Sequence, residues 1–260
     1  MNKILTVDIG NTNIATTLWN GDTPTPLASF TTKQSATCNE LKHSFESVLK
    51  LANINKTELI TGSVVSCVVP GIVSAAKKAL SMVIGNEPIV ISSELNVGIN
   101  FDSYDKKSLG ADRIADIVGA VMLYKAPVII CDLGTCTTIS AVDSEKKFIG
   151  GMICPGIQTS LDCLHSRVPH LPVVKAKETN LIIGNDTASS LLTGAVVGTA
   201  AMISEMASKL SGTKGMNNCT LILTGGNASF ILPQINTKIK TVYEPDLIMK
   251  GLREIYTNFC

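Results

Sequence analysis

Short apolar runs rich in β-branched residues alternate along this chain with longer segments that repeat apolar positions every three to four residues. The short runs are typical of strands and the longer segments of amphipathic helices. In the first half this pattern predicts strands at 4–7, 14–19 and 27–31, a helix at 39–52, a strand at 58–65, a helix at 72–83 and a strand at 89–91.

The second half repeats this order. It predicts strands at 128–131, 138–142 and 147–153, helical segments, a strand at 220–223, a short helix near 229–235, a strand at 239–243 and a terminal helix from 246. The later strand of each half also ends alike, with Thr61-Gly62-Ser63 in the first half and Thr224-Gly225-Gly226 in the second. Strand meanders followed by alternating helices and strands predict an α/β fold of two duplicated domains, at 1–110 and 111–260, each a mixed sheet flanked by helices.

Composition excludes several classes of function. The 22 basic and 21 acidic residues leave a net charge of +1, the longest lysine runs are isolated pairs, and aromatic residues make up 4% of the chain. A nucleic-acid-binding protein needs a basic stripe or aromatic stacking platforms, so we expect no nucleic-acid partner.

The eight cysteines include no Cys-x-x-Cys pair, and most lie in apolar stretches, which is typical of reduced thiols in a cytoplasmic protein. The N-terminus enters a strand without the basic segment of a signal peptide. Two uncharged runs of 18 residues, 59–76 and 187–204, contain Gly, Pro, Ser or Thr, and buried soluble elements explain them better than membrane spans. We therefore expect a cytoplasmic protein without a membrane segment.

One sequence motif occurs twice, each time after an apolar strand. Asp8-Ile9-Gly10-Asn11-Thr12-Asn13 is matched 124 residues later by Asp132-Leu133-Gly134-Thr135-Cys136-Thr137. Each copy predicts a tight turn with a carboxylate at its entrance and a glycine that lets backbone N–H groups approach an anion. A single Asp-x-Gly is common in β-hairpin turns. Two copies in duplicated halves instead indicate one nucleotide clamped between two similar domains.

A third element, Gly110-Ala111-Asp112-Arg113, opens the helix that joins the halves. The first turn of a helix favours a carboxylate and offers free N–H groups to an anion. Asp112 could be only a helix cap and Arg113 only a surface ion pair. The position between two phosphate turns favours a functional role instead.

Phosphoryl transfer needs bound phosphates, a cation and a carboxylate near the acceptor hydroxyl. Asp8 and Asp132 could organise cations or their waters, while Asn11, Thr12 and Thr135 could hold phosphate oxygens. Asp112 is then free to act as a base, and Arg113 suits a substrate that bears a carboxylate. The chain contains no Gly-x-x-x-x-Gly-Lys-[Ser/Thr] motif, which excludes a P-loop enzyme.

Two glycine-containing segments have structural explanations. Gly150-Gly151-Met152-Ile153-Cys154-Pro155-Gly156 predicts a sharp turn from a strand into a helix that begins near Ile157. Gly194 and Gly198, four residues apart in the Ala-rich helix after Thr187, indicate close helix packing.

These motifs together resemble the type III pantothenate kinases, a family within the acetate-kinase, sugar-kinase, Hsp70 and actin superfamily. The resemblance covers nearly the whole chain, and Gly110-Ala111-Asp112-Arg113 is its most specific element. It implies two ribonuclease-H-like domains of the actin-like ATPase type with a nucleotide cleft between them.

The resemblance also implies the roles of individual residues. ATP, with Mg2+, would be bound by Asp8, Gly10, Asn11, Thr12, Asn13, Ala15 and Thr135. Pantothenate would be bound by Gly110, Ala111, Asp112, Arg113 and Thr187, with Asp112 as proton acceptor. An activating potassium or ammonium ion would lie near Asp132, with Asp8 as a further metal-binding carboxylate. The long helix from Thr187 would pair two subunits as a homodimer.

The chain departs from the family at two places. The family has a Tyr, and a Pro three residues later, shortly before Gly-Ala-Asp-Arg, where this chain has Ser103 and Lys106. Either Tyr104, one residue late, takes the tyrosine's role, or the substrate pocket is altered. Cys136 also replaces a small residue such as Ala.

We therefore expect an ATP-dependent kinase that phosphorylates pantothenate to 4'-phosphopantothenate, the first step of coenzyme A synthesis. One rival is a kinase of the same superfamily for another small hydroxylated substrate. The other is a non-catalytic accessory or regulatory relative; two intact turns together with Asp112 argue against it, since a protein that only binds has no need of the spare base.

Overall fold

The computed structural model describes residues 3–54 and 60–259, and its contacts divide the chain into two compact α/β units. Unit 1 comprises Met1–Ile99, Asp105–Met122 and Leu247–Cys260, and unit 2 comprises Asn100–Tyr104 and Leu123–Asp246. These bounds differ from the expected 1–110 and 111–260, because most of helix α3 (Ala111–Tyr124) and the whole C-terminal helix belong to the first unit.

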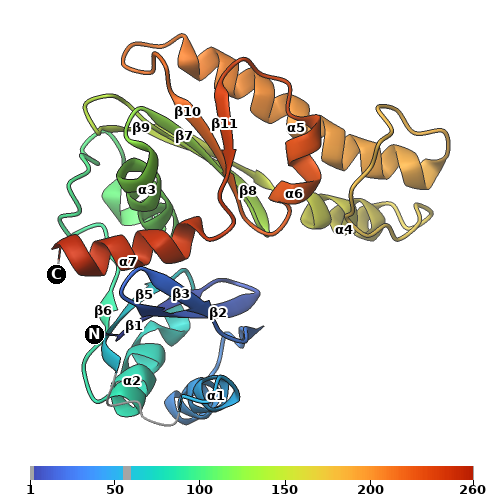
Figure 1. The fold of residues 1–260 in the computed structure, drawn as a ribbon. Coiled ribbons are helices and arrows are strands. Elements are labelled where there is room, and N and C mark those ends of the chain that lie inside the picture. The colour runs from blue at the N-terminus through green and yellow to red at the C-terminus, as the bar shows by residue number, and fades with distance from the viewer. Residues whose placement is uncertain (1–2, 55–59, 260) are drawn as a thin grey trace. The chain divides into compact units, whose positions relative to one another are not determined.

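Unit 1 is built from strands and helices in the predicted order (Figure 1). Its elements are β1 (Lys3–Ile9), β2 (Asn13–Asn20), β3 (Thr23–Pro26), β4 (Phe30–Thr31), α1 (Cys38–Leu51), β5 (Ile60–Cys67), α2 (Val73–Ile84), β6 (Ile89–Val90), the first part of α3 (Ala111–Tyr124) and α7 (Leu247–Phe259). The predicted strand at 58–65 has its first two residues outside the described part of the chain.

Unit 2 follows the same scheme, and one of its helices is much longer, with 25 residues. Its elements are the end of α3, β7 (Val128–Leu133), β8 (Cys136–Val142), β9 (Phe148–Pro155), α4 (Ile157–Arg167), α5 (Thr187–Ser211), β10 (Thr220–Thr224), α6 (Ala228–Ile231) and β11 (Lys240–Tyr243). Short 3-10 turns occur at Pro70–Ile72, Lys106–Ser108 and Leu232–Gln234.

The two sheets confirm the predicted duplication. The strand order is β3-β2-β1-β5-β6 in unit 1, with β4 paired to β2, and β9-β8-β7-β10-β11 in unit 2. In each sheet the first strand pairs antiparallel with the second and parallel with the strand that follows a helical crossover. Element by element, β1 corresponds to β7 and β5 to β10.

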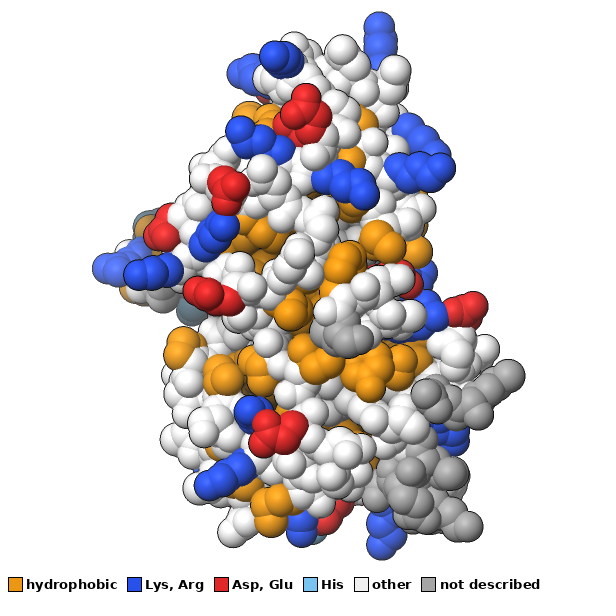
Figure 2. All heavy atoms as spheres, turned by 90° about the vertical axis from the view of Figure 1, so that its left-hand side faces the viewer, with side chains coloured by type: hydrophobic (Ala, Val, Ile, Leu, Met, Phe, Trp, Pro, Cys, Tyr) orange, Lys and Arg blue, Asp and Glu red, His pale blue; other side chains and the backbone are white. Residues whose placement is uncertain are grey.

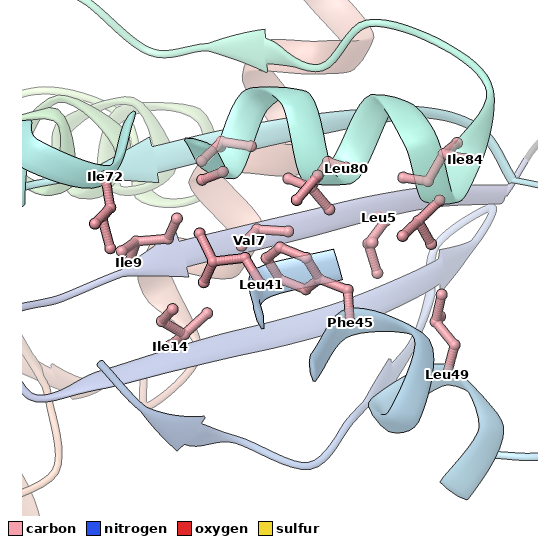
Figure 3. Close-up of a cluster of buried hydrophobic side chains, with 14 of the residues drawn as sticks. Leu5, Val7, Ile9, Ile14, Leu41, Phe45, Leu49, Ile72, Leu80 and Ile84 are labelled. Atoms are coloured by element: carbon pink, nitrogen blue, oxygen red, sulfur yellow. The ribbon is translucent and has the colours of Figure 1, made fainter. Parts of the chain in front are cut away.

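One face of the unit 1 sheet packs against α1 and α2. Figure 3 shows Leu5, Val7 and Ile9, alternate residues of β1, pointing into the same apolar cluster as Phe45 of α1 and Leu80 of α2. All five are nearly inaccessible to solvent. The alternation of β1 and the helical period of α1 and α2 therefore meet in one core.

The other face of the same sheet is covered by α7, which packs on β1, β2 and β5 (Figure 1). Thr6 lies on this face, where its hydroxyl accepts a 3.0 Å hydrogen bond from the Trp19 indole and lies 3.4 Å from the Met249 sulfur. Arg253 lies over the Trp19 ring at 5.3 Å and pairs with Asp22. The C-terminal helix is thus part of unit 1 because it completes the cover of its sheet.

Helices α3 and α7 approach each other through glycine. A Cβ at Gly251 would lie 1.9 Å from the Ala115 carbonyl oxygen, and one at Gly119 would lie 2.9 Å from the Leu247 carbonyl oxygen. No side chain fits in that space, so glycine at both positions allows the backbones to touch.

The core of unit 2 lies between one face of its sheet and helices α4, α5 and α6. Ile129, Cys131 and Leu133 of β7 point into it, together with Leu221 and Leu223 of β10. The opposite face of β7 is also buried at Val128 and Ile130, which explains its continuous apolar sequence.

Two details of the sequence analysis were wrong. The expected strand at 27–31 is reduced to Phe30–Thr31, while Thr23–Pro26 forms edge strand β3, where prolines are tolerated. The Thr-Gly steps are also not equivalent, because Thr61-Gly62 lies at the start of β5 and Thr224 ends β10. Gly62 is instead required by α7, since a Cβ there would lie 2.0 Å from the Tyr256 hydroxyl.

The surface shows no concentration of basic charge on the face drawn in Figure 2, where Lys and Arg side chains lie scattered among acidic and neutral ones.

All seven described cysteines are free; Cys131 and Cys219 are buried, whereas Cys136 and Cys163 are exposed. Helix α5 is long and apolar enough to cross a membrane by length and composition alone. Core helices of soluble proteins meet the same criterion, so it is weak evidence for a membrane span.

Replacing Gly251 by Ala should destabilise unit 1 by about 1–3 kcal/mol, the usual cost of overpacking, because the new methyl group must displace α3. Chemical denaturation measures this change. Gly194→Ala is the matched control, since Gly194 is also within a helix but has open space around it. Equal stabilities of the two variants would contradict the close packing of α3 and α7.

Candidate active site

The first phosphate turn joins β1 to β2 in unit 1. The Gly10 N–H donates a 3.0 Å hydrogen bond to the Asn13 carbonyl, and Ile9 pairs with Ile14. Asn11, Thr12 and Asn13 are exposed, whereas Asp8 and its cross-strand partner Ala15 are half-buried. The turn therefore presents polar side chains and backbone to solvent beyond a partly enclosed carboxylate.

Thr32, just after β4, braces this turn. Its hydroxyl donates to the Gly10 carbonyl at 2.7 Å, and its N–H donates to the Thr12 carbonyl at 2.9 Å. The sequence analysis did not identify Thr32, because no local pattern links it to a turn 20 residues earlier.

The turn lies at the carboxyl end of two parallel strands, the usual place for ligand sites in α/β sheets. Ile9 of β1 is in register with Cys67 of β5, and the Val68 N–H donates to the Ile9 carbonyl at 3.0 Å. Burial raises the pKa of the Cys67 thiol, and the nearby Asp8 carboxylate raises it further. Asp8 and the segment after β5 therefore share one edge of the sheet.

Helix α3 brings Asp112 to this same edge. A Cβ at Gly110 would lie 2.4 Å from Asp112 Oδ1 and 3.8 Å from Val68 Cγ1. Glycine at 110 thus leaves the space that the Asp112 carboxylate occupies. The structure brings together, within unit 1, the Asp8 turn and the Gly110–Arg113 element, which are about 100 residues apart in the sequence.

The Asp112 carboxyl group has an altered proton affinity. Burial raises its pKa above the ordinary value, while the Arg113 N–H, which donates to Oδ1 at 2.7 Å, and the Arg113 charge oppose that rise. Arg113 itself is buried in α3. A half-buried carboxylate with a raised pKa is a suitable proton acceptor for a hydroxyl group.

The second phosphate turn joins β7 to β8 in unit 2 and is one residue tighter than the first. Asp132 pairs with Thr138, whereas Asp8 pairs with Ala15. The Gly134 N–H donates to the Cys136 carbonyl at 3.0 Å, and Thr135 and Cys136 are exposed. The repeated motif therefore folds into two related but not identical turns.

Asp132 lies beside the segment that follows β10. Thr224 is in register with Asp132, and Gly225 has φ +86°. A Cβ at Gly225 would lie 2.2 Å from Asp132 Oδ1, so only glycine allows this contact with the carboxylate. No group of three or more His, Cys, Asp or Glu residues gathers within residues 3–54 and 60–259. A single carboxylate beside backbone suits a hard cation that keeps waters or substrate oxygens as its other ligands.

The remaining candidate residues lie in unit 2. The Tyr104 ring packs edge-on against Phe148 at a centroid distance of 5.0 Å, whereas Ser103 and Lys106 are exposed. Thr187 is the first residue of α5, exposed, and follows the capping residue Asp186. Each unit thus carries part of the predicted set, with Asp8, Gly110, Ala111, Asp112 and Arg113 in unit 1 and Tyr104, Asp132, Thr135 and Thr187 in unit 2.

The fold resembles several solved structures. A Baf family protein from Campylobacter jejuni aligns with a TM-score of 0.60 at 20% identity, covering 98% of both chains. A ROK family glucokinase from Streptomyces griseus, in complex with glucose and AMPPNP, aligns with a TM-score of 0.50 at 12% identity over 97% of both chains. At these identities the likeness supports the fold, a duplicated ribonuclease-H-like architecture.

Sequence comparison is more specific. A type III pantothenate kinase from Agathobacter rectalis is 32% identical over 97% of this chain and 96% of its own length. One from Exiguobacterium sibiricum is 31% identical over 97% and 98%. The family model for type III pantothenate kinase matches residues 4–209, which include both phosphate turns and the Gly110–Arg113 element. The chain therefore belongs to the type III pantothenate kinase family.

Proposed function

We propose that this protein transfers the γ-phosphoryl group of ATP to the primary hydroxyl of pantothenate, forming 4'-phosphopantothenate in the first step of coenzyme A synthesis in the cytoplasm. Family membership supports the reaction. The observation that carries its chemistry is Asp112, whose raised pKa and position beside the Asp8 turn suit a general base.

In this proposal the two turns hold the phosphates of ATP. Asp8, Gly10, Asn11, Thr12, Asn13 and Ala15 form the first set of contacts and Thr135 contributes from the second turn. Backbone N–H groups at Gly-containing turns are well suited to phosphate oxygens. Bound Mg2+ would neutralise phosphate charge, and we propose Asp8 and Asp132 as the carboxylates that hold it or its waters.

Pantothenate is proposed to bind at Gly110–Arg113, with Tyr104 and Thr187 as further contacts. Arg113 offers a buried cation for the pantothenate carboxylate. Asp112 then accepts the proton of the attacking hydroxyl as that oxygen forms its bond to the γ-phosphorus. The Tyr104 ring is fixed against Phe148, which favours its use as a pocket wall in place of the family's earlier tyrosine.

The rival functions give different results in one experiment. A coupled assay of ADP release, with pantothenate, with a panel of sugars and without acceptor, should show turnover that depends on pantothenate. Turnover with a sugar alone would identify another small-molecule kinase. No turnover with any acceptor would favour an accessory protein.

Asp112→Asn should leave the fold and ATP binding intact but reduce kcat by about 10²–10⁴-fold, because the acceptor hydroxyl loses its base. In the parent protein kcat should fall as the pH is lowered, because Asp112 becomes protonated and can no longer act as a base. The raised pKa of Asp112 places this fall at a higher pH than an ordinary aspartate would. A near-normal kcat in the variant would show that Asp112 is not the base and acts only as a helix cap.

Asp132→Ala should remove most activity together with any activation by potassium or ammonium. The motivation is a carboxylate held against Gly225 at the second turn. Initial rates in buffers with sodium, potassium or ammonium as the sole monovalent cation provide the measurement. Full activity of the parent protein in sodium alone would remove the basis for a cation site at Asp132.

Helix α5 supports a homodimer. Only six of its 25 residues are buried, although its composition is apolar.

Gly194 and Gly198 have open space where a side chain would be. A groove of about 370 Å³, which includes Leu164 and Met202, and one of about 320 Å³, which includes Ile182 and Ile183, both border these glycines. Ile182 and Ile183 are each 82% exposed, so a second copy would cover an otherwise exposed apolar surface.

Gly198→Trp should therefore weaken self-association and pantothenate binding together, because the indole fills the space needed for close helix approach. Analytical ultracentrifugation and titration with pantothenate measure the two effects. Ser208→Trp, at an exposed position of the same helix outside both grooves, is the control. A fully active monomeric parent at micromolar concentration would rule the dimer out.

A further inference from the structure

The segment that follows β4 lies directly against the first phosphate turn. Thr32 donates its hydroxyl to the Gly10 carbonyl at 2.7 Å and its N–H to the Thr12 carbonyl at 2.9 Å. Lys33 is the next residue, so its Cα lies about 3.8 Å from that of Thr32. The lysine backbone is therefore adjacent to the turn, and its long side chain starts within reach of an anion there.

Lys33 is also the only basic residue in the two segments that the sheet brings to this turn. These segments are residues 4–33, from β1 to the end of the Thr32 contact, and residues 60–69, which contain β5; the structure describes both in full. The other charged groups that they contribute are the carboxylates of Asp8 and Asp22. A nucleotide carries several negative charges on its phosphates, and lysine binds phosphate as a point charge. The first turn thus has one lysine that could offset this charge.

The Lys33 side chain is paired with a carboxylate at the start of α1. Its Nζ lies 2.6 Å from Glu40 Oε1, and the two side chains are 63% and 48% exposed. The Lys33 contact, followed by the Thr37 N–H and hydroxyl, lowers the pKa of Glu40 to about 2, so this carboxylate is charged at neutral pH. An exposed ion pair of this kind contributes little stability. Lys33 can therefore exchange Glu40 for a more highly charged anion at small cost.

We infer that Lys33 is a further nucleotide-binding residue, which exchanges its pair with Glu40 for a phosphate oxygen at the first turn. Glu40 is then a competitor, because it holds the lysine and adds a negative charge close to the phosphates. This inference rests on the proposed function, because it takes the Asp8 turn to bind ATP.

Two substitutions with opposite expected effects test this inference. Lys33→Gln should weaken the binding of Mg-ADP about two- to tenfold, because a charge-assisted bond to phosphate is lost. Glu40→Gln should tighten it about two- to fivefold, the range that an exposed ion pair can contribute. Glutamine at this position keeps the capping box with Thr37. Calorimetric titration with Mg-ADP measures both effects, which should shrink at high ionic strength.

Lys42→Gln and Glu46→Gln are the matched controls. These residues form an ion pair at 3.2 Å within α1, and neither lies in a segment bonded to the turn, so both variants should bind Mg-ADP as the parent does. A displaced α1 would instead change the affinity in the same direction in Lys33→Gln and Glu40→Gln. The inference is overturned if Lys33→Gln binds as tightly as the parent, or if Glu40→Gln binds no more tightly.

The turnover assay with pantothenate separates this inference from the proposed function. If the parent protein binds Mg-ADP but does not phosphorylate pantothenate, the proposed function fails, while the titrations still decide the role of Lys33. If the parent phosphorylates pantothenate and Lys33→Gln keeps the parent affinity for Mg-ADP, only the role of Lys33 fails.

Discussion

The parallel pairing of each central strand with the strand that follows its crossover helix is the constraint on which this structure depends. In unit 1 it aligns Ile9 with Cys67, and in unit 2 it aligns Asp132 with Thr224. In β1 the apolar residues Leu5, Val7 and Ile9 share one face while Thr6 and Asp8 share the other, which fixes the register, since a slip of one residue would turn every core side chain to the opposite face. The carboxylates at the ends of β1 and β7 therefore lie at a defined edge beside the segments that follow β5 and β10.

Close backbone contacts then decide what can occupy these edges. Gly110 leaves space for the Asp112 carboxylate, and Gly225 lets the chain pass directly against Asp132. In both places a methyl group would collide with a carboxylate oxygen. These glycines contribute to the site because they have no side chain. Each carboxylate therefore lies directly against backbone, which holds it in a fixed position.

The two turns also show how a duplicated motif diverges. The first is braced by Thr32 from the sheet itself, through the Gly10 and Thr12 carbonyls. The second is one residue tighter and is braced by Thr159 and Asn227 from helical segments. In both turns carbonyl oxygens accept hydrogen bonds from segments outside the turn.

The sequence by itself determined the order of the elements, the duplication and the position of each phosphate turn, because apolar periodicity and glycine-containing turns are local properties. It also identified Gly110–Arg113 as the start of a helix. Only the tertiary structure decided that α7 completes unit 1, that Gly62 accommodates Tyr256 and that Thr32, Thr159 and Asn227 brace the turns. These contacts join residues from 20 to more than 240 positions apart in the chain. No local pattern encodes such contacts, because they depend on the packing of whole elements.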